Sequence, residues 1–495
     1  MYAIGYDIGS SSVKASIVRT DDGVLVAHGK FPGSEMPISA LQPGWAEQDP
    51  ENWWQNVCIL TRSLIKQNHI EPSHIQSIGI SYQMHGLVLV DKSQQVLRPS
   101  IIWCDSRAGA YGEKAHHELG ADYTLGHLLN SPGNFTASKL KWVLENEPAV
   151  YARINKWMLP GDFIAMKFTG EICSTLSGYS EGILWDFKND QPALKLMEYY
   201  GIPNEIMPPI ADTFSIQGKV TAQAAQESGL AQGTPVTYRA GDQPNNALSL
   251  KVLHPGDVAA TGGTSGVIYG ITDQAIFDPD SRVNGFAHVN HHSDHPRIGQ
   301  LLCINGCGIQ YAWIRQHVAG DEADYNKMEN EIERIPVGSD GLLIFPFGNG
   351  SERMLKDQLT GARMENLHFN RHTRTHIYRA ALEGIAFSFA YGMEILRTVG
   401  IKPESIRVGN DNLFLSQTFT KTMSNLLQCN IEMYNTTGST GAAKASMVAT
   451  GSFDSVEEAI AEMKPVQTTF YAKDHSEYVQ AYKLWRKKLE DLIDL

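Results

Sequence analysis

The stretch GYDIGSSSVK, residues 5–14, places one acidic residue at the end of an apolar run and follows it with a glycine, three serines and a lysine. The run that contains Asp7 is typical of a β-strand, and the small polar residues after it are typical of a tight turn. Such a turn surrounds an anion with backbone N–H groups and hydroxyls, beside a carboxylate that holds Mg²⁺ directly or through water. Taken alone, the stretch favours a plain β-hairpin with a polar turn.

A second stretch of the same design, TGGTSG at residues 261–266, lies just past the middle of the chain. Two phosphate-compatible hairpins indicate a weak internal duplication and predict a nucleotide held between two related domains. We expect the domain boundary near residues 245–255, which gives domains of residues 1–248 and 249–495. The sequence contains neither G-x-x-x-x-G-K-[ST] nor G-x-G-x-x-G, so the P-loop and the dinucleotide-binding fingerprint are excluded.

Short apolar runs bounded by glycine, proline, aspartate or serine predict strands, and longer runs with apolar residues every three or four positions predict helices. The expected class is therefore α/β with mixed sheets. The strongest strand patterns are AIGYDIG, KASIVRT, SIGISYQ, LVLVDK and LRPSIIW, and the strongest helical patterns lie at residues 51–67, 377–399 and 477–493.

The composition excludes several classes of function. With 41 Lys and Arg against 54 Asp and Glu, the net charge is −13 and no basic run stands out, so nucleic acid is a poor candidate partner. No segment approaches the roughly 20 apolar residues of a membrane span. The first residues lack the pattern of a signal peptide, and we expect a soluble cytoplasmic protein. The six cysteines form no C-x-x-C pair, so reduced thiols are expected.

Transfer of a γ-phosphate requires a carboxylate that orients the acceptor hydroxyl and takes its proton. Asp242, in the stretch YRAGDQPNNALSL, follows an apolar run and a glycine and precedes a segment with helical potential. Its side chain is then expected to project from a turn into the cleft. Spacing alone leaves open whether Asp242 is this base or only the N-cap of the following helix.

Together these motifs resemble the FGGY family of carbohydrate kinases, and most closely its xylulose kinase branch. The Met-His-Gly step at residues 84–86 is the most discriminating of them. The matches run along nearly the whole chain, at residues 6–18, 46–54, 83–91, 96–108, 159–171, 240–247, 261–266, 348–354 and 437–451. The resemblance implies two ribonuclease H-like (actin/hexokinase-type) domains, with mixed β-sheets flanked by helices and the active site in the cleft between them.

The resemblance also implies an ATP- and Mg²⁺-dependent kinase that converts D-xylulose to D-xylulose 5-phosphate, with Asp242 as general base and Asp7 positioning the metal. The alternatives are another sugar or polyol such as ribulose, gluconate or glycerol, or a non-catalytic sugar sensor. The implied sugar contacts are Met84, His85, Trp103, Asp105 and Gln243. The implied phosphate and nucleotide contacts are Gly9, Ser10, Ser11, Ser12, Lys14, Gly263, Thr264, Ser265, Gly409 and Asn410.

The chain departs from the family pattern in three places. Xylulose kinases usually have Asp-Asn where this chain reads Asp242-Gln243, which puts the identity of the sugar in doubt. The family's adenine-side loop has three glycines where this chain reads VGNDNLFLSQ at residues 408–417, so the nucleotide contacts there are also in doubt. A second acid that many relatives carry after residue 171 is replaced by LSGYSEG at 176–182, for which the sequence alone offers no interpretation.

Two further features are interpreted conservatively. The histidine run HVNHHSDH at residues 288–295 lacks the cysteine or carboxylate pattern of a metal site, and a solvated loop is expected. The amphipathic C-terminal helix is expected to dock on its own domain or on the second copy of a homodimer.

Overall fold

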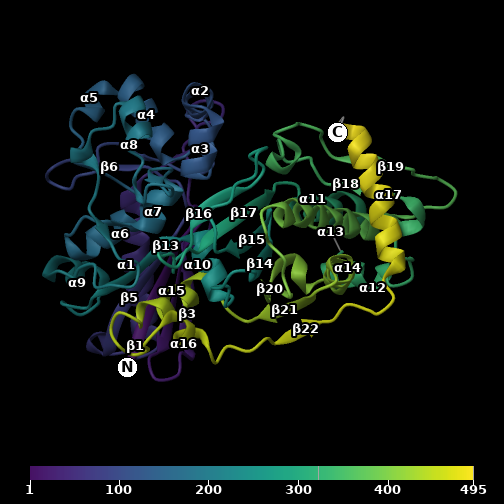
Figure 1. The fold of residues 1–495 in the computed structure, drawn as a ribbon. Coiled ribbons are helices and arrows are strands. Elements are labelled where there is room, and N and C mark those ends of the chain that lie inside the picture. Colours follow the sequence, from purple (N-terminus) through teal and green to yellow (C-terminus); the bar gives the residue numbers. More distant parts are fainter. Residues whose placement is uncertain (321–322, 494–495) are drawn as a thin grey trace.

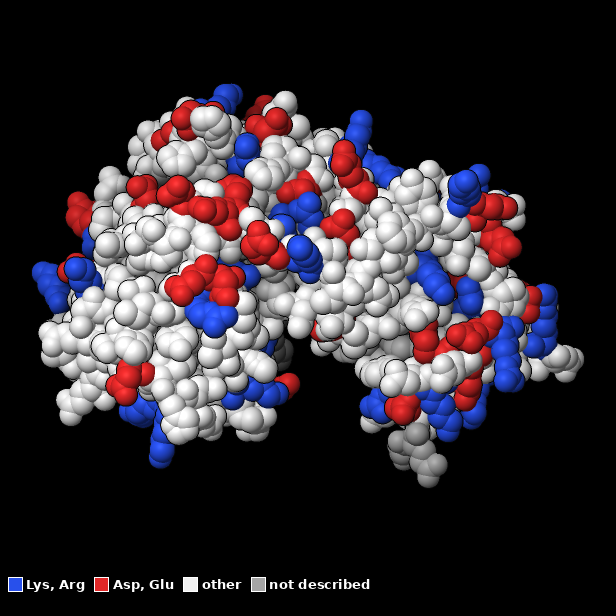
Figure 2. Space-filling model, turned by 90° about the horizontal axis from the view of Figure 1, so that it is seen from below, with Lys and Arg blue, Asp and Glu red and all other residues white. Residues whose placement is uncertain are grey.

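The chain folds into two lobes, each built on a β-sheet, with the N-terminus on one lobe and the C-terminal helix on the other (Figure 1). The structure is a computed structural model that describes residues 1–320 and 323–493. The surface is deeply hollowed between the two lobes (Figure 2). This arrangement confirms the predicted α/β architecture of two domains with mixed sheets.

The N-terminal sheet has the strand order β13-β5-β1-β2-β3. Strands β1, β2 and β3 form an antiparallel meander, whereas β5 and β13 run parallel to β1. The carboxyl ends of β1, β5 and β13 therefore lie at one edge of the sheet, where the candidate acids were expected. The strands are β1 (Tyr2–Ile8), β2 (Val13–Arg19), β3 (Leu25–Phe31), β5 (Ile75–Tyr82) and β13 (Val236–Gly241).

The C-terminal sheet repeats this pattern within a larger order, β16-β17-β15-β14-β20-β21-β22. Its β14 and β15 are antiparallel, and β20 and β21 run parallel to β14, as β5 and β13 do to β1. The predicted internal duplication is thus present in the sheet topology. The strands are β14 (Val258–Gly262), β15 (Gly266–Thr272), β16 (Asn284–Ala287), β17 (Ile298–Ile304), β20 (Ser405–Gly409), β21 (Asn430–Tyr434) and β22 (Gln467–Thr469).

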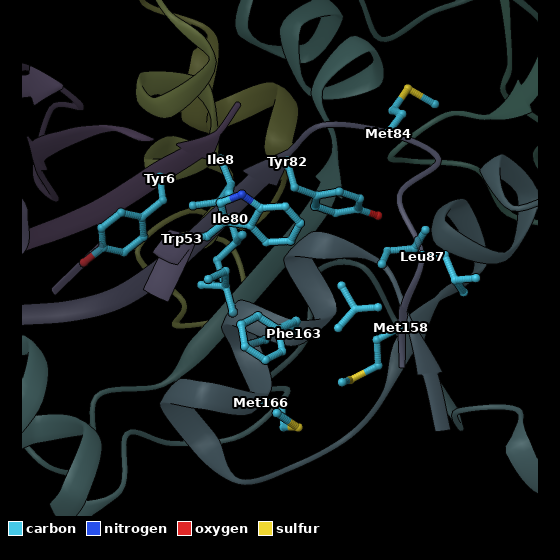
Figure 3. Close-up of a cluster of buried hydrophobic side chains, with 14 of the residues drawn as sticks. Tyr6, Ile8, Trp53, Ile80, Tyr82, Met84, Leu87, Met158, Phe163 and Met166 are labelled. Atoms are coloured by element: carbon cyan, nitrogen blue, oxygen red, sulfur yellow. The ribbon is translucent and has the colours of Figure 1, made fainter. Parts of the chain in front are cut away.

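Helices cover both sheets and form the two main cores. In the N-terminal lobe, Trp53 of α1 packs among the buried strand residues Tyr6, Ile8 and Ile80, and Met84 lies at the edge of the same cluster (Figure 3). In the C-terminal lobe, α13 contributes more residues to the core than any other element, and α17 packs against it. The longest helices are α1 (Pro50–Gln67), α2 (Gly109–Leu119), α4 (Thr136–Asn146), α6 (Pro160–Thr169), α13 (Arg374–Thr398), α14 (Gln417–Leu427) and α17 (Ser476–Ile493).

Two short helices cross between the lobes. Helix α10 (Asp242–Ser249) ends the N-terminal half, whereas α15 (Gly438–Ser446) comes from the C-terminal half and packs on the N-terminal sheet beside β1 and β5 (Figure 1). A Cβ atom added to Gly5 or Gly79 would overlap the backbone of α15, so only glycine permits this close approach. The boundary between residues 248 and 249 stays a prediction. Helix α15 follows that boundary in the sequence but packs on the sheet that precedes it.

Helix α17 docks on its own lobe, which is one of the two predicted outcomes. Trp485 is fully buried, stacks on Phe345 and donates a hydrogen bond from Nε1 to the Ile344 carbonyl oxygen at 3.0 Å. The six cysteines are free thiols. Across the two described ranges, no helix is long and apolar enough to cross a membrane, and no three His, Cys, Asp or Glu side chains are grouped to hold a metal.

Candidate active site

The two candidate acids lie on either side of the end of β5. Asp7 of β1 is in register with Ser81, and Gly241, which directly precedes Asp242, is in register with Tyr82. The Ser81 hydroxyl donates a hydrogen bond to Asp7 Oδ1 at 3.3 Å. Since the three strands are parallel neighbours, the sheet itself brings the two carboxylates to one edge.

Asp242 is the first residue of α10, and Gly241 occupies the N-cap position. The alternative that Asp242 serves as the N-cap is therefore wrong. The side chain is partly buried. Burial, together with the negative charge of Asp7, raises the pKa of Asp242 from 3.8 to about 7, against the opposing effects of Gln243 and Lys14. A carboxyl group with a pKa near neutrality suits a general base, because it is both available and able to take a proton.

Asp7 lies where the two halves of the chain meet. Lys14 Nζ is 3.5 Å from its Oδ2, and Gly438 at the start of α15 lies against the same oxygen. Asn245 of α10 donates a hydrogen bond from Nδ2 to the Gly438 carbonyl oxygen at 2.8 Å. Mg²⁺ is usually held by one or two carboxylates together with phosphate oxygens and water, so the Asp7–Asp242 pair fits this ion without a larger ligand cluster.

The turn between β1 and β2 has the form expected of a phosphate-binding hairpin. The Gly9 N–H donates to the Ser12 carbonyl oxygen at 3.1 Å, which closes the turn. Within the described residues, the backbone N–H groups of Ser10 and Ser11 donate no hydrogen bond, and the Ser11 side chain is exposed. Unpaired amides in a turn make a concave site for an anion.

The second hairpin, between β14 and β15, opens onto a cavity of about 650 Å³. The start of α11 (Gly308–Ile314) is fixed to it, because the Gly308 and Ile309 N–H groups donate to the Gly263 and Thr264 carbonyl oxygens at 3.0 and 3.1 Å. The cavity is lined by Gly262, Gly263, Thr264, Gly308, Ile309, Tyr311, Ala312, Asp324, Tyr325, Asn326, Glu329, Asn412, Leu413, Leu415 and Ser416.

The adenine-side residues predicted from sequence are not among those that line this cavity. Gly409 ends β20, and the Asn410 N–H donates to the Tyr434 carbonyl oxygen at 2.9 Å. The lining comes instead from Asn412 to Ser416, further along the same segment. Contacts of Gly409, Asn410 and Ser265 with a nucleotide stay predictions. The sequence did not predict that Ile309 and Tyr311 line the cavity, since an apolar face on a short helix carries no signal of its own.

The predicted sugar-side residues differ in their placement. Met84 is buried directly beside Gly241, and His85 follows it at the end of β5. Trp103 is exposed, and its Nε1 lies 3.4 Å from Ser10 Oγ of the first hairpin. Asp105 is buried behind them, and its carboxylate accepts from the Ala46 N–H and from Arg107. A direct contact of Asp105 or Gln243 with a sugar stays a prediction.

His85 is held by two buried residues that the sequence did not single out. Its φ angle is 62°, its backbone N–H donates to Glu181 Oε1 at 3.3 Å, and its Nδ1 lies 2.9 Å from the Glu181 carbonyl oxygen. Lys139 Nζ donates to the His85 carbonyl oxygen at 2.8 Å. Glu181 lies in the uninterpreted stretch LSGYSEG. With a serine before it and a glycine after it, Glu181 carries no local signal of burial.

Comparison with known proteins gives a consistent result. The family models described as the N-terminal and C-terminal domains of the FGGY family of carbohydrate kinases match residues 2–249 and 258–450. The xylulose kinase of Bacillus subtilis (strain 168) is 28% identical over 487 residues, covering 97% of this chain and 94% of that protein.

Solved structures agree in fold over the full length. The xylulose kinase of Rhodospirillum rubrum matches with a TM-score of 0.87 and 26% identity, covering 100% of both chains. The gluconate kinase of Lactobacillus acidophilus matches with a TM-score of 0.89 and 21% identity, covering 99% of this chain and 98% of that one. At that identity the second likeness bears on the fold alone.

Proposed function

The chain belongs to the FGGY family of carbohydrate kinases and is a sugar kinase that uses ATP; from this premise we propose that its acceptor is D-xylulose and its product D-xylulose 5-phosphate. The observation that carries the proposal is the placement of Asp242, which lies with Asp7 at one sheet edge and directly follows Gly241, the residue that packs against Met84. Asp242 then serves as the general base.

Phosphate binding and proton transfer are carried out by different residues. The free amides of Ser10 and Ser11 and the hairpin at Gly263 and Thr264 bind phosphate oxygens from the two lobes. Asp242 accepts the proton of the sugar hydroxyl as that oxygen attacks the γ-phosphorus, and the bond to the β-phosphate oxygen breaks. Positioning of this kind supplies most of the rate in phosphoryl transfer.

A bound Mg²⁺ would neutralise charge on the phosphate oxygens, and Asp7 is the residue that would hold it. Lys14, 3.5 Å from Asp7, fixes the orientation of that carboxylate from the neighbouring strand. The exposed Trp103 indole reaches the first hairpin at Ser10. Closure of the cleft would exclude water, which otherwise competes as acceptor.

Support for D-xylulose in particular comes from the Met84–His85 step and from the relatives. The xylulose kinases of Bacillus subtilis and Escherichia coli (strain K12) are 28% and 27% identical to this chain. Gln243 stands where xylulose kinases usually have asparagine. For this reason ribulose, gluconate and glycerol are the alternative acceptors to test.

The test is a coupled ADP-release assay with MgATP and a panel of D-xylulose, L-xylulose, D-ribulose, L-ribulose, gluconate and glycerol. We expect the highest kcat/KM with D-xylulose. A higher value for another acceptor would keep the chemistry and replace the substrate. Absence of acceptor-dependent ADP release would favour a non-catalytic sugar sensor. The Asp242→Asn variant, purified in the same way, is the control for contaminating kinases.

A further inference from the structure

Two ionisable side chains are fully buried beside the candidate sugar pocket and have no part in the transfer chemistry. Glu181 ends α7 (Leu176–Glu181) and Lys139 lies in α4, and both are 0% exposed. Burial of such groups is unfavourable unless hydrogen bonds compensate for the lost water. Their hydrogen bonds converge on one residue, His85.

These contacts fix the backbone of His85 on both sides. The Glu181 carboxyl accepts its N–H, and the Lys139 ammonium donates both to its carbonyl oxygen and, at 2.9 Å, to the carbonyl oxygen of Ile102, which precedes Trp103. The φ angle of 62° is unfavourable for a residue other than glycine, so the surroundings must hold it. Lys139 thereby couples the two segments that carry His85 and Trp103.

The ring of His85 is fixed as well. It packs edge-on against Phe135, with centroids 4.7 Å apart, and against Phe286 of β16 at 5.4 Å. A carbonyl oxygen can only accept, so the 2.9 Å contact with the Glu181 carbonyl oxygen requires a proton on Nδ1. Burial, and next the charge of Lys139, lowers the pKa of His85 to about 3, so the ring is neutral.

The remaining ring nitrogen is therefore an acceptor. A neutral imidazole with its proton on Nδ1 has a lone pair on Nε2. Within the described residues Nε2 has no hydrogen-bond partner, and it is not among the buried polar atoms that lack one, so it faces accessible space. This nitrogen is the part of His85 that remains available to a substrate.

We propose that Glu181 is a positioning residue that presents His85 Nε2 as a pure hydrogen-bond acceptor, so that the sugar must donate a hydroxyl at this point. The inference deepens the proposed function and rests on it, because it requires a sugar in this pocket. A substrate that offers a carbonyl or carboxylate oxygen there meets a lone pair and is rejected. The pocket thus selects a substrate group that donates a hydrogen bond over one that can only accept.

The state of the Glu181 carboxyl indicates how it acts. Its Oε2 has no partner and lies against the α-carbon of Gly241, next to Asp242, in a space that a Cβ on Gly241 would fill. Burial, together with the charge of Asp242, raises the pKa of Glu181 well above its usual range. Glu181 therefore acts through hydrogen-bond geometry and not through charge, and glutamine is expected to replace it.

The first test uses D-xylulose analogues in which each non-reacting hydroxyl is replaced in turn by hydrogen or by fluorine, which cannot donate. At one position we expect both replacements to raise KM about tenfold, the effect of one lost hydrogen bond. In His85→Ala this penalty disappears. A fluoro analogue that binds as well as the parent at every position, or a penalty that persists in His85→Ala, would overturn the proposal.

The second test separates positioning from folding. Glu181→Gln should leave KM for the sugar within about threefold, whereas Glu181→Leu, which leaves the His85 N–H unsatisfied, should raise it at least about tenfold with a smaller change in kcat. Glu383→Gln is the matched control. Glu383 is also buried, accepts from the Gly338 N–H at 3.0 Å and lies in the other lobe, so only stability should change. Equal KM in the glutamine and leucine variants would contradict the proposed role.

The third test needs no substrate. The ¹⁵N shifts of the His85 ring, assigned by their loss in His85→Gln, should show a protonated Nδ1 and an unprotonated Nε2 across the neutral pH range. The opposite tautomer would refute the inference whatever sugar the enzyme uses. If D-xylulose is not phosphorylated but the Nδ1–H tautomer is found, the proposed substrate fails, and the analogue test is repeated with the true acceptor.

Discussion

Lys14 and Asp7 face each other in register across the first two strands, with Nζ 3.5 Å from Oδ2. This pair lies beside Asp242, and the two charges act on its carboxyl in opposite directions: Asp7 raises its pKa and Lys14 lowers it. The hairpin proposed to bind phosphate therefore also carries two charges that set the pKa of the proposed base.

Removal of the Lys14 charge should shift the acidic limb of the pH–rate profile. With the pKa of Asp242 at about 7, kcat/KM is expected to fall as the pH drops below neutrality, because the base becomes protonated. Lys14→Gln should move this limb to higher pH. Lys30→Gln, on the neighbouring exposed strand, is the control, and an unshifted limb in Lys14→Gln would exclude this coupling.

Asp242→Asn should nearly abolish turnover. General-base catalysis contributes about 10²- to 10⁴-fold, so kcat is expected to fall by that range while sugar affinity, measured by calorimetry, changes little. Retention of substantial kcat would remove Asp242 from the assigned role. Asp49→Asn, at the N-cap of α1, is a control for loss of an acid elsewhere in the same lobe.

The same substitution should stabilise the fold at high pH. Because the pKa of Asp242 is about 7 in the fold and near 3.8 in the unfolded chain, the folded state binds the proton more tightly. The folded state therefore loses stability as pH rises between these values, and the loss is complete above about pH 7. Thermal unfolding near pH 8 should show Asp242→Asn more stable by on the order of 4 kcal/mol, with little difference near pH 4. A destabilised variant near pH 8 would contradict the raised pKa.

Gly308→Ala should weaken nucleotide binding and spare the sugar. A Cβ at this position would overlap the Gly263 carbonyl oxygen and displace the second hairpin from α11. We expect KM for ATP to rise at least about tenfold, as for the loss of one or two hydrogen bonds. Gly126→Ala, in α3 (Ala121–Leu128) with open space around it, is the matched control. Equal effects on KM for ATP and on KM for the sugar would argue against separate nucleotide and sugar sites in the cleft.

Gly5→Ala should disrupt the contact between the N-terminal sheet and α15. The added Cβ meets backbone atoms of Ser439 and Ala443, which cannot yield as a flexible side chain does. We expect a loss of about 2–4 kcal/mol in unfolding free energy, measured by urea denaturation. Gly33→Ala, with nothing within 4 Å of the new Cβ, should be neutral, and similar stabilities of the two variants would refute the account.

The sequence predicted those parts of the site that depend on short-range pattern. The strand carrying Asp7, the hairpin at residues 261–266 and the helix that begins with Asp242 are local features with clear periodicity and turn residues. The convergence of Glu181 and Lys139 on His85 depends on how α4 and α7 pack together, and no local pattern encodes it. The segment 408–417 was singled out from the sequence, but the residues of it that line the cavity are Asn412, Leu413, Leu415 and Ser416, and not the predicted Gly409 and Asn410.

The packing between the two lobes does not follow the order of the chain. A boundary after residue 248 assigns everything beyond it to the second domain, yet α15 packs on β1 and β5 through Gly5 and Gly79. A helix rich in small residues has no preference for one sheet over the other in its sequence. The hydroxyls of Ser16 in the sheet and Ser439 in α15 lie 2.8 Å apart. The two residues are far apart in the sequence, so this contact is visible only in the structure.

The crossing of α15 has a consequence for how the protein is made. Residues 1–248 emerge from the ribosome before the helix that completes their sheet, and at about 5–20 residues per second the interval lasts roughly 10–40 s. During that time one face of the nascent sheet is uncovered. Two separately expressed halves are therefore expected to recover a native N-terminal lobe only when they are produced together.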